Sequence, residues 1–376
     1  MSKTIIIIGA GLAGLSAALQ AAENGCNVKL VSSLPSERAQ SVMAEGGINA
    51  ALNTKDENDS PEEHFTDTIK AACGLVDPNA VWGMTQAAPE LVHWLLKLGV
   101  KFNMSGYDDV DLRNFGGQKK KRTAFAQSDT GKQIMTAMID AVRRKEASGM
   151  VERFSHHSFL TLRLCGNICC GCVIRDEYSQ ETVELPGDAV IVATGGMHGL
   201  FGNTTGSLSN TGEVTAELFR LGVPLANGEM IQYHPTTVKC GGKRMLISEA
   251  ARGEGGRLFA MKDGKQWYFM EEKYPELGNL MPRDITAREI WKVSHESEVF
   301  LDMTEISEEI ISNKLSGLAD DCMTYLHKDI RKEPVSVLPG IHYFMGHLHS
   351  ALGRRHPQRG KAQPDRKSTR LNSSHT

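Results

Sequence analysis

The 376-residue chain lacks three features that would place it in a special class of protein. It has no apolar run near the roughly 18 to 20 residues that a membrane-spanning helix needs. Its N-terminus has no basic segment followed by a long apolar one, because glycines interrupt the first apolar run. Its formal net charge of −3 gives no general attraction to nucleic acid or membrane surfaces. We therefore expect a globular cytoplasmic protein with no membrane span and no nucleic-acid partner.

The eight cysteines do not form the paired C-x-x-C sets of a structural zinc site. The densest group, at 169–172, lies in a segment with the pattern of two strands joined by a turn at 166–167. Neighbouring residues of a strand point to opposite faces, so these thiols are not expected to converge on one ion. We predict no metal site, and reduced cysteines.

The chain does contain a glycine-rich turn at its start. A β-branched run leads into GAGLAG at 9–14 and then into a segment rich in alanine and leucine. Gly9 permits the tight turn, Gly11 lets the backbone approach a phosphate, and Gly14 lets the helix pack on the strand. This strand-turn-helix unit predicts a dinucleotide whose pyrophosphate lies at the helix N-terminus.

Residues 26–33 have the pattern of the second strand of this unit. A nicotinamide dinucleotide site usually has an acidic residue at the end of that strand, where it binds the ribose. Ser32 and Ser33 occupy this place. Any ribose contact here is therefore made by a hydroxyl group, which argues against a simple NAD site.

The rest of the chain divides into two parts by composition. The first part alternates helical and strand patterns and ends in a buried strand that leads into a glycine pair. Its predicted helices cover 61–75 and 78–98 and begin again at 129, and its last strand covers 189–196 and ends in the glycine pair. From about 225 to 340, polar and charged residues lie among glycines, which indicates a second domain that brings a site to the first.

Seven segments in order point to a known family. They are SVMAEGGINAAL, RTAFAQSDTG, VIVATGG, IQYHPT, LISEAARGEGG, MPRD and LPGIHYFMG. Over residues 3–346 the chain resembles the flavoprotein subunits of fumarate reductase and succinate dehydrogenase. L-aspartate oxidase shares most of the segments.

The resemblance implies an α/β fold. A Rossmann-like FAD-binding domain, with a parallel sheet and a β-meander, is interrupted by an inserted α+β capping domain. We place the first at 1–225 and the second at 226–346, both incomplete, and we treat 347–376 as an irregular, non-native tail. The family pattern breaks after Gly346, so we expect the chain as written to be a truncated fragment that binds FAD poorly and does not turn over.

The resemblance also implies FAD as the cofactor. Its contacts would be Gly9, Gly11, Gly14, Ser32, Ser41, Gly46, Gly47, Thr194, Gly195 and Glu213. Glu213 stands in TGEV, where the family has TGDG. Many members attach FAD covalently to a histidine, but Gln40 occupies that position. We therefore predict non-covalent FAD.

The catalytic groups implied by the resemblance lie in the second domain. The substrate carboxylates would be bound by His234, Ser248 and His342. The proton donor would be Arg283, with Glu249 and Arg252 as the relay behind it. The structural alternative is that Glu249 and Arg252 form an ion pair one helical turn apart, and that Arg283 and Asp284 form a helix-capping pair.

The resemblance implies an FAD-dependent oxidoreductase. It would transfer hydride between flavin N5 and a C4 dicarboxylate, fumarate or succinate. Because the chain carries no cluster ligands, its electrons would pass through an iron-sulphur subunit, and partner subunits would hold it at the cytoplasmic face of the membrane. Two alternatives stay open: L-aspartate oxidase of NAD biosynthesis, and a non-catalytic FAD-dependent assembly or binding protein.

Overall fold

The β-branched N-terminal run forms an inner strand of a four-stranded parallel sheet in the computed structural model, which describes residues 2–115 and 118–348. The strand order is β10-β1-β2-β6, and every neighbouring pair is parallel. This sheet, together with the antiparallel sheets described below, confirms the predicted α/β fold class. The parallel strands are β1 (Thr4–Ile8), β2 (Asn27–Ser32), β6 (Val151–Ser155) and β10 (Ala189–Val192).

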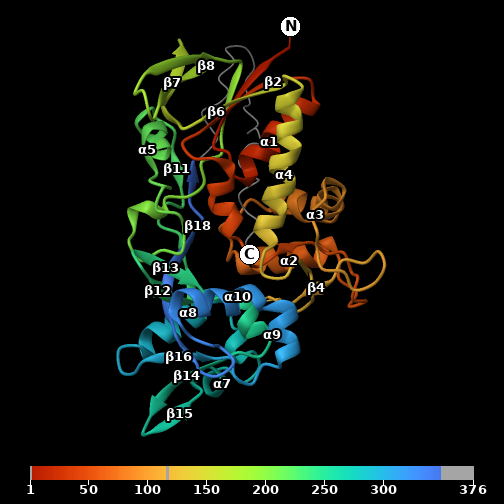
Figure 1. Ribbon diagram of the computed structural model, residues 1–376, viewed down its shortest axis with the longest axis vertical. Coiled ribbons are helices and arrows are strands. Elements are labelled where there is room, and N and C mark those ends of the chain that lie inside the picture. Colours follow the sequence, from red (N-terminus) through yellow and green to blue (C-terminus); the bar gives the residue numbers. More distant parts are fainter. Residues whose placement is uncertain (1, 116–117, 349–376) are drawn as a thin grey trace.

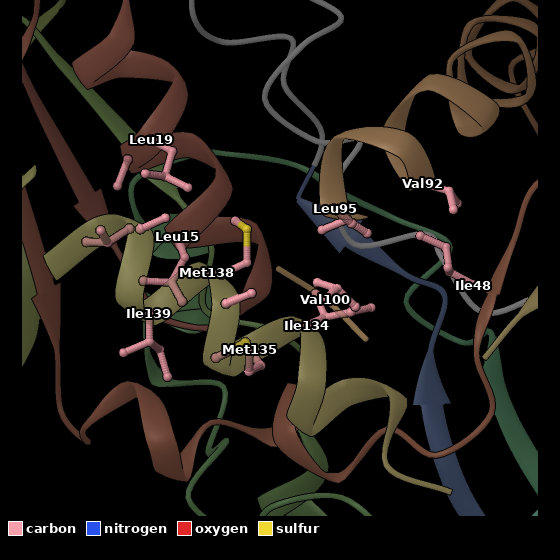
Figure 2. Close-up of a cluster of buried hydrophobic side chains, with 14 of the residues drawn as sticks. Leu15, Leu19, Ile48, Val92, Leu95, Val100, Ile134, Met135, Met138 and Ile139 are labelled. Carbon is pink, nitrogen blue, oxygen red and sulfur yellow. The ribbon is translucent and has the colours of Figure 1, made fainter. Parts of the chain in front are cut away.

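Two helices pack against each other beside this sheet. Leu15 and Leu19 of α1 (Leu12–Glu23) meet Met135 and Met138 of α4 (Thr130–Ala147) in one buried apolar cluster (Figure 2).

Two further helices, α2 (Pro61–Ala71) and α3 (Pro78–Leu98), lie between β2 and β6 in the chain. The predicted bounds of α3 are correct. Helix α2 ends four residues earlier than predicted, and the chain then passes through Cys73 at φ 50°, outside the helical range.

The predicted strand pair around 166–167 belongs to a three-stranded antiparallel meander. Its strands are β7 (His157–Cys165), β8 (Ile168–Asp176) and β9 (Thr182–Pro186). The prediction that all cysteines are reduced is wrong, because Cys165 and Cys170 form a disulfide across this hairpin. The hairpin turn brings the two residues together from adjacent strands.

A second body follows with its own apolar core, drawn from residues 238–337. Figure 1 shows β14, β15 and β16 at one end of the long axis and the β7–β8 hairpin at the other, with β18 between them. Two antiparallel sheets build the body, in the orders β13-β12-β18 and β15-β14-β16-β17. Their strands are β12 (Ile231–Cys240), β13 (Lys243–Leu246), β14 (Arg257–Lys262), β15 (Lys265–Trp267), β16 (Val299–Asp302), β17 (Val335–Ser336) and β18 (Leu338–Phe344).

The helices of the second body are short. They are α6 (Glu249–Gly253), α7 (Phe269–Lys273), α8 (Arg283–Val293), α9 (Glu308–Lys314) and α10 (Ser316–Asp321). The remaining elements belong to the first body or join the two: β3 (Ile48–Asn49), β4 (Leu112–Arg113), β5 (Thr123–Ala124), α5 (Glu213–Arg220) and β11 (Leu225–Ala226).

The start of the predicted tail is not irregular. Strand β19 (His347–Leu348) pairs antiparallel with β11, so the first two residues of the tail belong to the fold. The rest of that prediction falls on 349–376 and lies outside the described residues.

Within residues 2–115 and 118–348, no helix combines the length and apolar character needed to cross a membrane. In the same part of the chain, no three His, Cys, Asp or Glu side chains are arranged to hold a metal ion.

A buried ionic group ties α2 to the loop before β5. Arg122 is almost fully buried and pairs with Asp59 and Asp67, each at 2.9 Å. His64 of α2 is buried beside this group. Burial, with a smaller effect from the Arg122 charge, lowers the pKa of His64 to about 4. The ring is therefore neutral in the folded chain at neutral pH.

The pKa of His64 predicts a loss of stability in acid. Because the folded pKa lies below the ordinary value of 6.5, the unfolded chain binds the proton more readily below that pH. The stabilisation is complete above about pH 6.5 and is lost as the pH falls through 4, by about 3 kcal/mol in all. Urea unfolding of wild type and of His64→Gln between pH 4 and 7 measures this, and the substituted chain should have a flatter profile. The exposed His93→Gln is the control, and equal slopes for wild type and His64→Gln would contradict the prediction.

Candidate functional site

The glycines of the N-terminal turn lie in close backbone contacts. Gly9 has φ 108°, and a Cβ there would lie 2.2 Å from the Ala193 carbonyl oxygen. A Cβ on Gly14 would lie 1.8 Å from the Gly9 carbonyl oxygen, so α1 packs directly on the turn. At Gly11 the nearest atom to an added Cβ is Oγ of Ser41, at 3.4 Å. The first and third glycines therefore serve packing, and the second leaves the turn open to a phosphate.

The N-terminus of α1 suits an anion. Its N-cap residue is Gly11, which has no side chain to cap it, and its first turn contains no acidic residue. Oγ of Ser41 accepts a hydrogen bond from Leu12 N at 3.3 Å, which brings the 40–43 turn to this end of the helix. Ser32 lies at the end of β2, and its Oγ is buried with no hydrogen-bond partner among the described residues. An orphaned hydroxyl here fits the ribose contact predicted from the sequence.

A cavity of about 430 Å³ lies beside the carboxyl ends of β2 and β6. Its lining includes Ser36 from the turn after β2 and Ser155 from the end of β6. Nη1 of Arg153 donates to Oγ of Ser36 at 2.9 Å. The position next to Ser32 and the polar lining fit the adenosine half of a dinucleotide.

The predicted cofactor contacts Gly46 and Gly47 lie in a tight loop. Gly47 has φ 127°, and a Cβ there would lie 2.5 Å from the Ala124 carbonyl oxygen. The buried Arg113 holds the loop, with Nε donating to the Gly46 carbonyl at 3.2 Å and Nη2 to the Glu45 carbonyl at 3.1 Å. Sequence reasoning missed Arg113, because no motif distinguishes this arginine from the many exposed ones.

Glu45, next to this glycine pair, was also missed. Its Oε2 is buried without a hydrogen-bond partner among the described residues. Burial, reinforced by the nearby Asp321 charge, raises the pKa of Glu45 to about 8. A carboxyl that is protonated near neutral pH can donate a hydrogen bond to a ligand in this loop.

The remaining predicted cofactor contacts are Thr194, Gly195 and Glu213. Thr194 follows the Ala193 carbonyl that faces Gly9, which places it at the glycine turn. An added Cβ on Gly195 would lie 3.3 Å from Nδ2 of Asn210. Glu213 begins α5, is exposed, and makes no hydrogen bond or ion pair within the described residues.

The three predicted catalytic residues form one group of alternating charges, in which Glu249 and Arg252 are buried and Arg283 is partly exposed. Glu249 is 4% exposed and Arg252 is 2% exposed. Oε2 of Glu249 accepts from Nε of Arg283 at 2.8 Å, and Oε1 accepts from Nη2 of Arg252 at 3.1 Å. The predicted pairing of Glu249 with Arg252 is present, but Arg283 joins it and makes no ion pair with Asp284 within the described residues.

Burial by itself raises the pKa of the Glu249 carboxyl. The guanidinium groups of Arg283 and Arg252 outweigh that effect and hold the pKa of Glu249 below its ordinary value. Glu249 is therefore ionised at neutral pH between two cations. A carboxylate in that position can accept a proton from one arginine and pass it to the other.

Two residues that the sequence did not suggest complete this group. Nη1 of Arg283 donates to Oε1 of Gln232 at 2.8 Å, and Nη1 of Arg252 donates to the Asn279 carbonyl at 2.6 Å. These bonds leave Nη2 of Arg283 without a hydrogen-bond partner among the described residues. Gln232 stands in IQYHPT, two residues before His234, and that proximity is the signal that would have found it.

The two predicted histidine ligands lie together. His234 of β12 is fully buried, and its ring centroid lies 5.2 Å from that of His342 on β18. Nε2 of His234 is buried with no hydrogen-bond partner among the described residues. Burial, then the charges of Arg283 and His342, lower the pKa of His234 well below its ordinary value. A neutral ring with an unused nitrogen remains available to a ligand.

His342 and Ser248 are held by local contacts. Nδ1 of His342 lies 2.7 Å from Oγ1 of Thr205, so the first body orients this ring. Ser248 is the buried N-cap of α6, and its Oγ accepts from Ala250 N at 3.4 Å. The hydroxyl hydrogen of Ser248 is not used in that bond and remains available to an acceptor.

Comparison with known proteins shows relatives along nearly the whole chain. Residues 4–349 match the family described as FAD binding domain. The chain is 43% identical over 355 residues to the succinate dehydrogenase flavoprotein subunit of Bacillus subtilis, covering 92% of the chain and 61% of that relative. It is 33% identical over 358 residues to the L-aspartate oxidase of a Nostoc species, covering 93% and 59%.

Among solved structures, a quinol fumarate reductase FrdA chain of E. coli is similar, with a TM-score of 0.84 and 28% identity. The match covers 93% of this chain and 61% of that one. The chain thus spans about three fifths of the length of the relatives it matches.

The ion pairs of Glu249 with Arg252 and Arg283 predict the effect of neutralising its carboxylate. Glu249→Gln keeps the size of the side chain but leaves the guanidinium groups of Arg252 and Arg283 without their shared counter-ion. Breaking a buried ion pair from one side destabilises a protein by about 3 to 5 kcal/mol. Urea unfolding measures the change. The control is Glu308→Gln, which breaks an exposed pair with Arg331 and should have little effect. Equal losses for the two variants would contradict the buried-pair interpretation.

Proposed function

Because the chain belongs to the FAD binding domain family, we propose that it acts as the flavoprotein of a fumarate reductase or succinate dehydrogenase. The observation that carries this proposal is the group in which Arg252 and Arg283 share the buried carboxylate of Glu249, next to the paired rings of His234 and His342. A purely structural ion pair needs neither a third charge nor an unused, buried histidine nitrogen beside it.

The residues of the first body fit the cofactor. The open turn at Gly11, the N-terminus of α1 and the orphaned hydroxyl of Ser32 would hold the pyrophosphate and ribose. Ser41, Gly46, Gly47, Thr194, Gly195 and Glu213 are proposed as further contacts. Gln40 cannot form the histidyl bond of covalent family members, so the cofactor is held non-covalently. When bound, FAD supplies the hydride donor or acceptor at N5 of its flavin.

The residues of the second body would bind and orient a dicarboxylate. Nδ1 of His234 lies 3.1 Å from the Thr236 carbonyl oxygen and 3.3 Å from Thr236 N. The tautomer that would donate to a substrate carboxylate is the one in which Nδ1 accepts from Thr236 N and Nε2 carries the proton. His342 and the Ser248 hydroxyl supply further polar contacts. Holding both carboxylates fixes the central carbons of the substrate against the cofactor.

Arg283 then moves the proton. Its Nη2 reaches the substrate, while Nε and Nη1 are held by Glu249 and Gln232. A guanidinium rarely releases a proton in a protein. The proposed relay is Glu249, which is hydrogen-bonded to both arginines and would pass a proton from Arg252 to Arg283 after Arg283 has donated its own.

We also propose a division into domains, an electron partner and a cellular location. The separate core at 238–337 supports a division into an FAD-binding domain at 1–225 and a capping domain at 226–346. An iron-sulphur subunit is the proposed electron partner, and a cytoplasmic site, at the membrane face through partner subunits, is the proposed location. The second candidate is L-aspartate oxidase, supported by the Nostoc relative and by Gln40.

The proton-donor role of Arg283 is tested in the chain extended with the part of the Bacillus subtilis relative that it does not span. Arg283→Gln should lower kcat for fumarate reduction by a reduced viologen dye by about 10² to 10⁴-fold, as expected when a general acid is removed. Arg288→Gln, an exposed residue on the same helix, is the control and should keep full activity.

The same assay separates the two candidate functions. Turnover of fumarate without oxidation of aspartate by oxygen is expected. Aspartate oxidation without fumarate reduction would replace the proposal with the oxidase. Equal activity of Arg283→Gln and Arg288→Gln would remove Arg283 from the mechanism.

Non-covalent attachment makes a separate prediction. Flavin reconstituted into the extended chain should be released completely into the supernatant on acid precipitation. Gly14→Ala, which places a Cβ against the Gly9 carbonyl, should lower flavin content, whereas Gly202→Ala, which meets no atom within 4 Å, should not. Flavin that stays with the precipitated protein would contradict the assignment of Gln40.

A further inference from the structure

A second polar cavity lies outside the candidate site. It has a volume of about 290 Å³ and lies where β13, the start of β18 and the end of α8 meet. Its lining includes the side chain of Arg244 and the segment Leu338–Pro339. None of the predicted catalytic or cofactor residues lines it.

Arg244 is a buried cation without an acidic partner. It is 9% exposed and makes no ion pair within the described residues. Its Nε donates to Oγ1 of Thr237, and its Nη2 donates to the Thr237 carbonyl at 3.0 Å and the Leu338 carbonyl at 3.5 Å. Nη1 has no hydrogen-bond partner among the described residues. Burial lowers the pKa of Arg244, as expected for a charge with no counter-ion nearby.

The fold makes room for this guanidinium. An added Cβ on Gly340 would lie 2.7 Å from Cδ of Arg244 and 3.2 Å from its Nε. Any other residue at 340 would therefore displace the arginine side chain. The glycine and the three hydrogen bonds fix one side of the guanidinium, and Nη1 is left for the cavity.

The remaining lining indicates the chemistry of a ligand. Asn203, Ser294 and His295 contribute polar groups, and none of the described residues that line the cavity is acidic. The Trp291 ring lies edge-on to the ring of His295 with centroids 4.5 Å apart. Together with Leu338 and Pro339, it gives the cavity an apolar wall.

We propose that this cavity binds a small organic carboxylate. Burying an unpaired charge is costly, and an anion that accepts from Nη1 offsets that cost. One guanidinium balances the single charge of a carboxylate, whereas the second charge of a phosphate would be left unpaired. The apolar wall at Trp291 packs against the hydrocarbon part of the ligand. The site goes beyond the proposed function, because it needs neither FAD nor the Arg283 group.

Calorimetric titration with butyrate, and separately with inorganic phosphate, tests the proposal in the full chain. The butyrate binding that depends on Arg244 should have one-to-one stoichiometry and be tighter than the binding of phosphate. Arg244→Gln should weaken butyrate binding about tenfold or more, as expected when a charged hydrogen bond is lost. Arg283→Gln should leave this binding unchanged, so failure of the proposed function would not affect the result.

Trp291→Ala is the second variant, because its exposed side chain can be removed without disturbing the core. It should weaken butyrate binding severalfold and leave phosphate binding unchanged. Arg288→Gln is the matched charge control and should bind as wild type does. Butyrate affinity that is the same in wild type and Arg244→Gln would overturn the site. Phosphate binding as tight as butyrate would overturn the carboxylate assignment.

Discussion

The carboxylate of Glu249 is the constraint on which the second body depends. Two guanidinium groups share it, one buried (Arg252) and one partly exposed (Arg283), and the charge of Arg252 could not be buried there without it. The pairing fixes the start of α8 against α6, and Gln232 extends it to β12. The positive charges that this carboxylate holds in place also help to keep His234 neutral. One side chain thus sets the position of the helices and the protonation of the neighbouring ring.

The candidate site also depends on how the two bodies are joined. Strand β18 pairs with β12 in the second body, and Ile341 bridges to Thr204 of the first. Nε2 of His198 lies 2.9 Å from the His342 carbonyl oxygen, and Thr205 contacts the His342 ring. His342 is therefore positioned from both sides. Because both bodies contact His342, its position depends on how the two bodies are placed relative to each other.

Much of this arrangement follows from local patterns in the chain. The β-branched run before Gly9 predicts β1, because both the shape of these side chains and their burial favour a strand. The ends of α3 follow from the proline at its start and the glycine just after it. The ordered motifs predict which residues belong to the candidate site. Arg113, Gln232 and the Cys165–Cys170 disulfide were not foreseen, because each depends on contacts between segments that the fold alone brings together. The pairing of β19 with β11 is of the same kind, since a two-residue strand has no periodicity to detect.

The disulfide in the β7–β8 hairpin illustrates how a covalent bond can matter little to a fold. Its cysteines are five positions apart, so it closes a very small ring and removes little freedom from the unfolded chain. Loop-closure entropy for such a ring corresponds to about 2 kcal/mol. The hairpin is already aligned by its backbone ladder, and the parallel sheet has its own buried strands. The architecture is therefore compatible with both oxidation states of this pair, and a change in the redox poise of the surroundings would alter the tip of one hairpin without altering the domain beneath it.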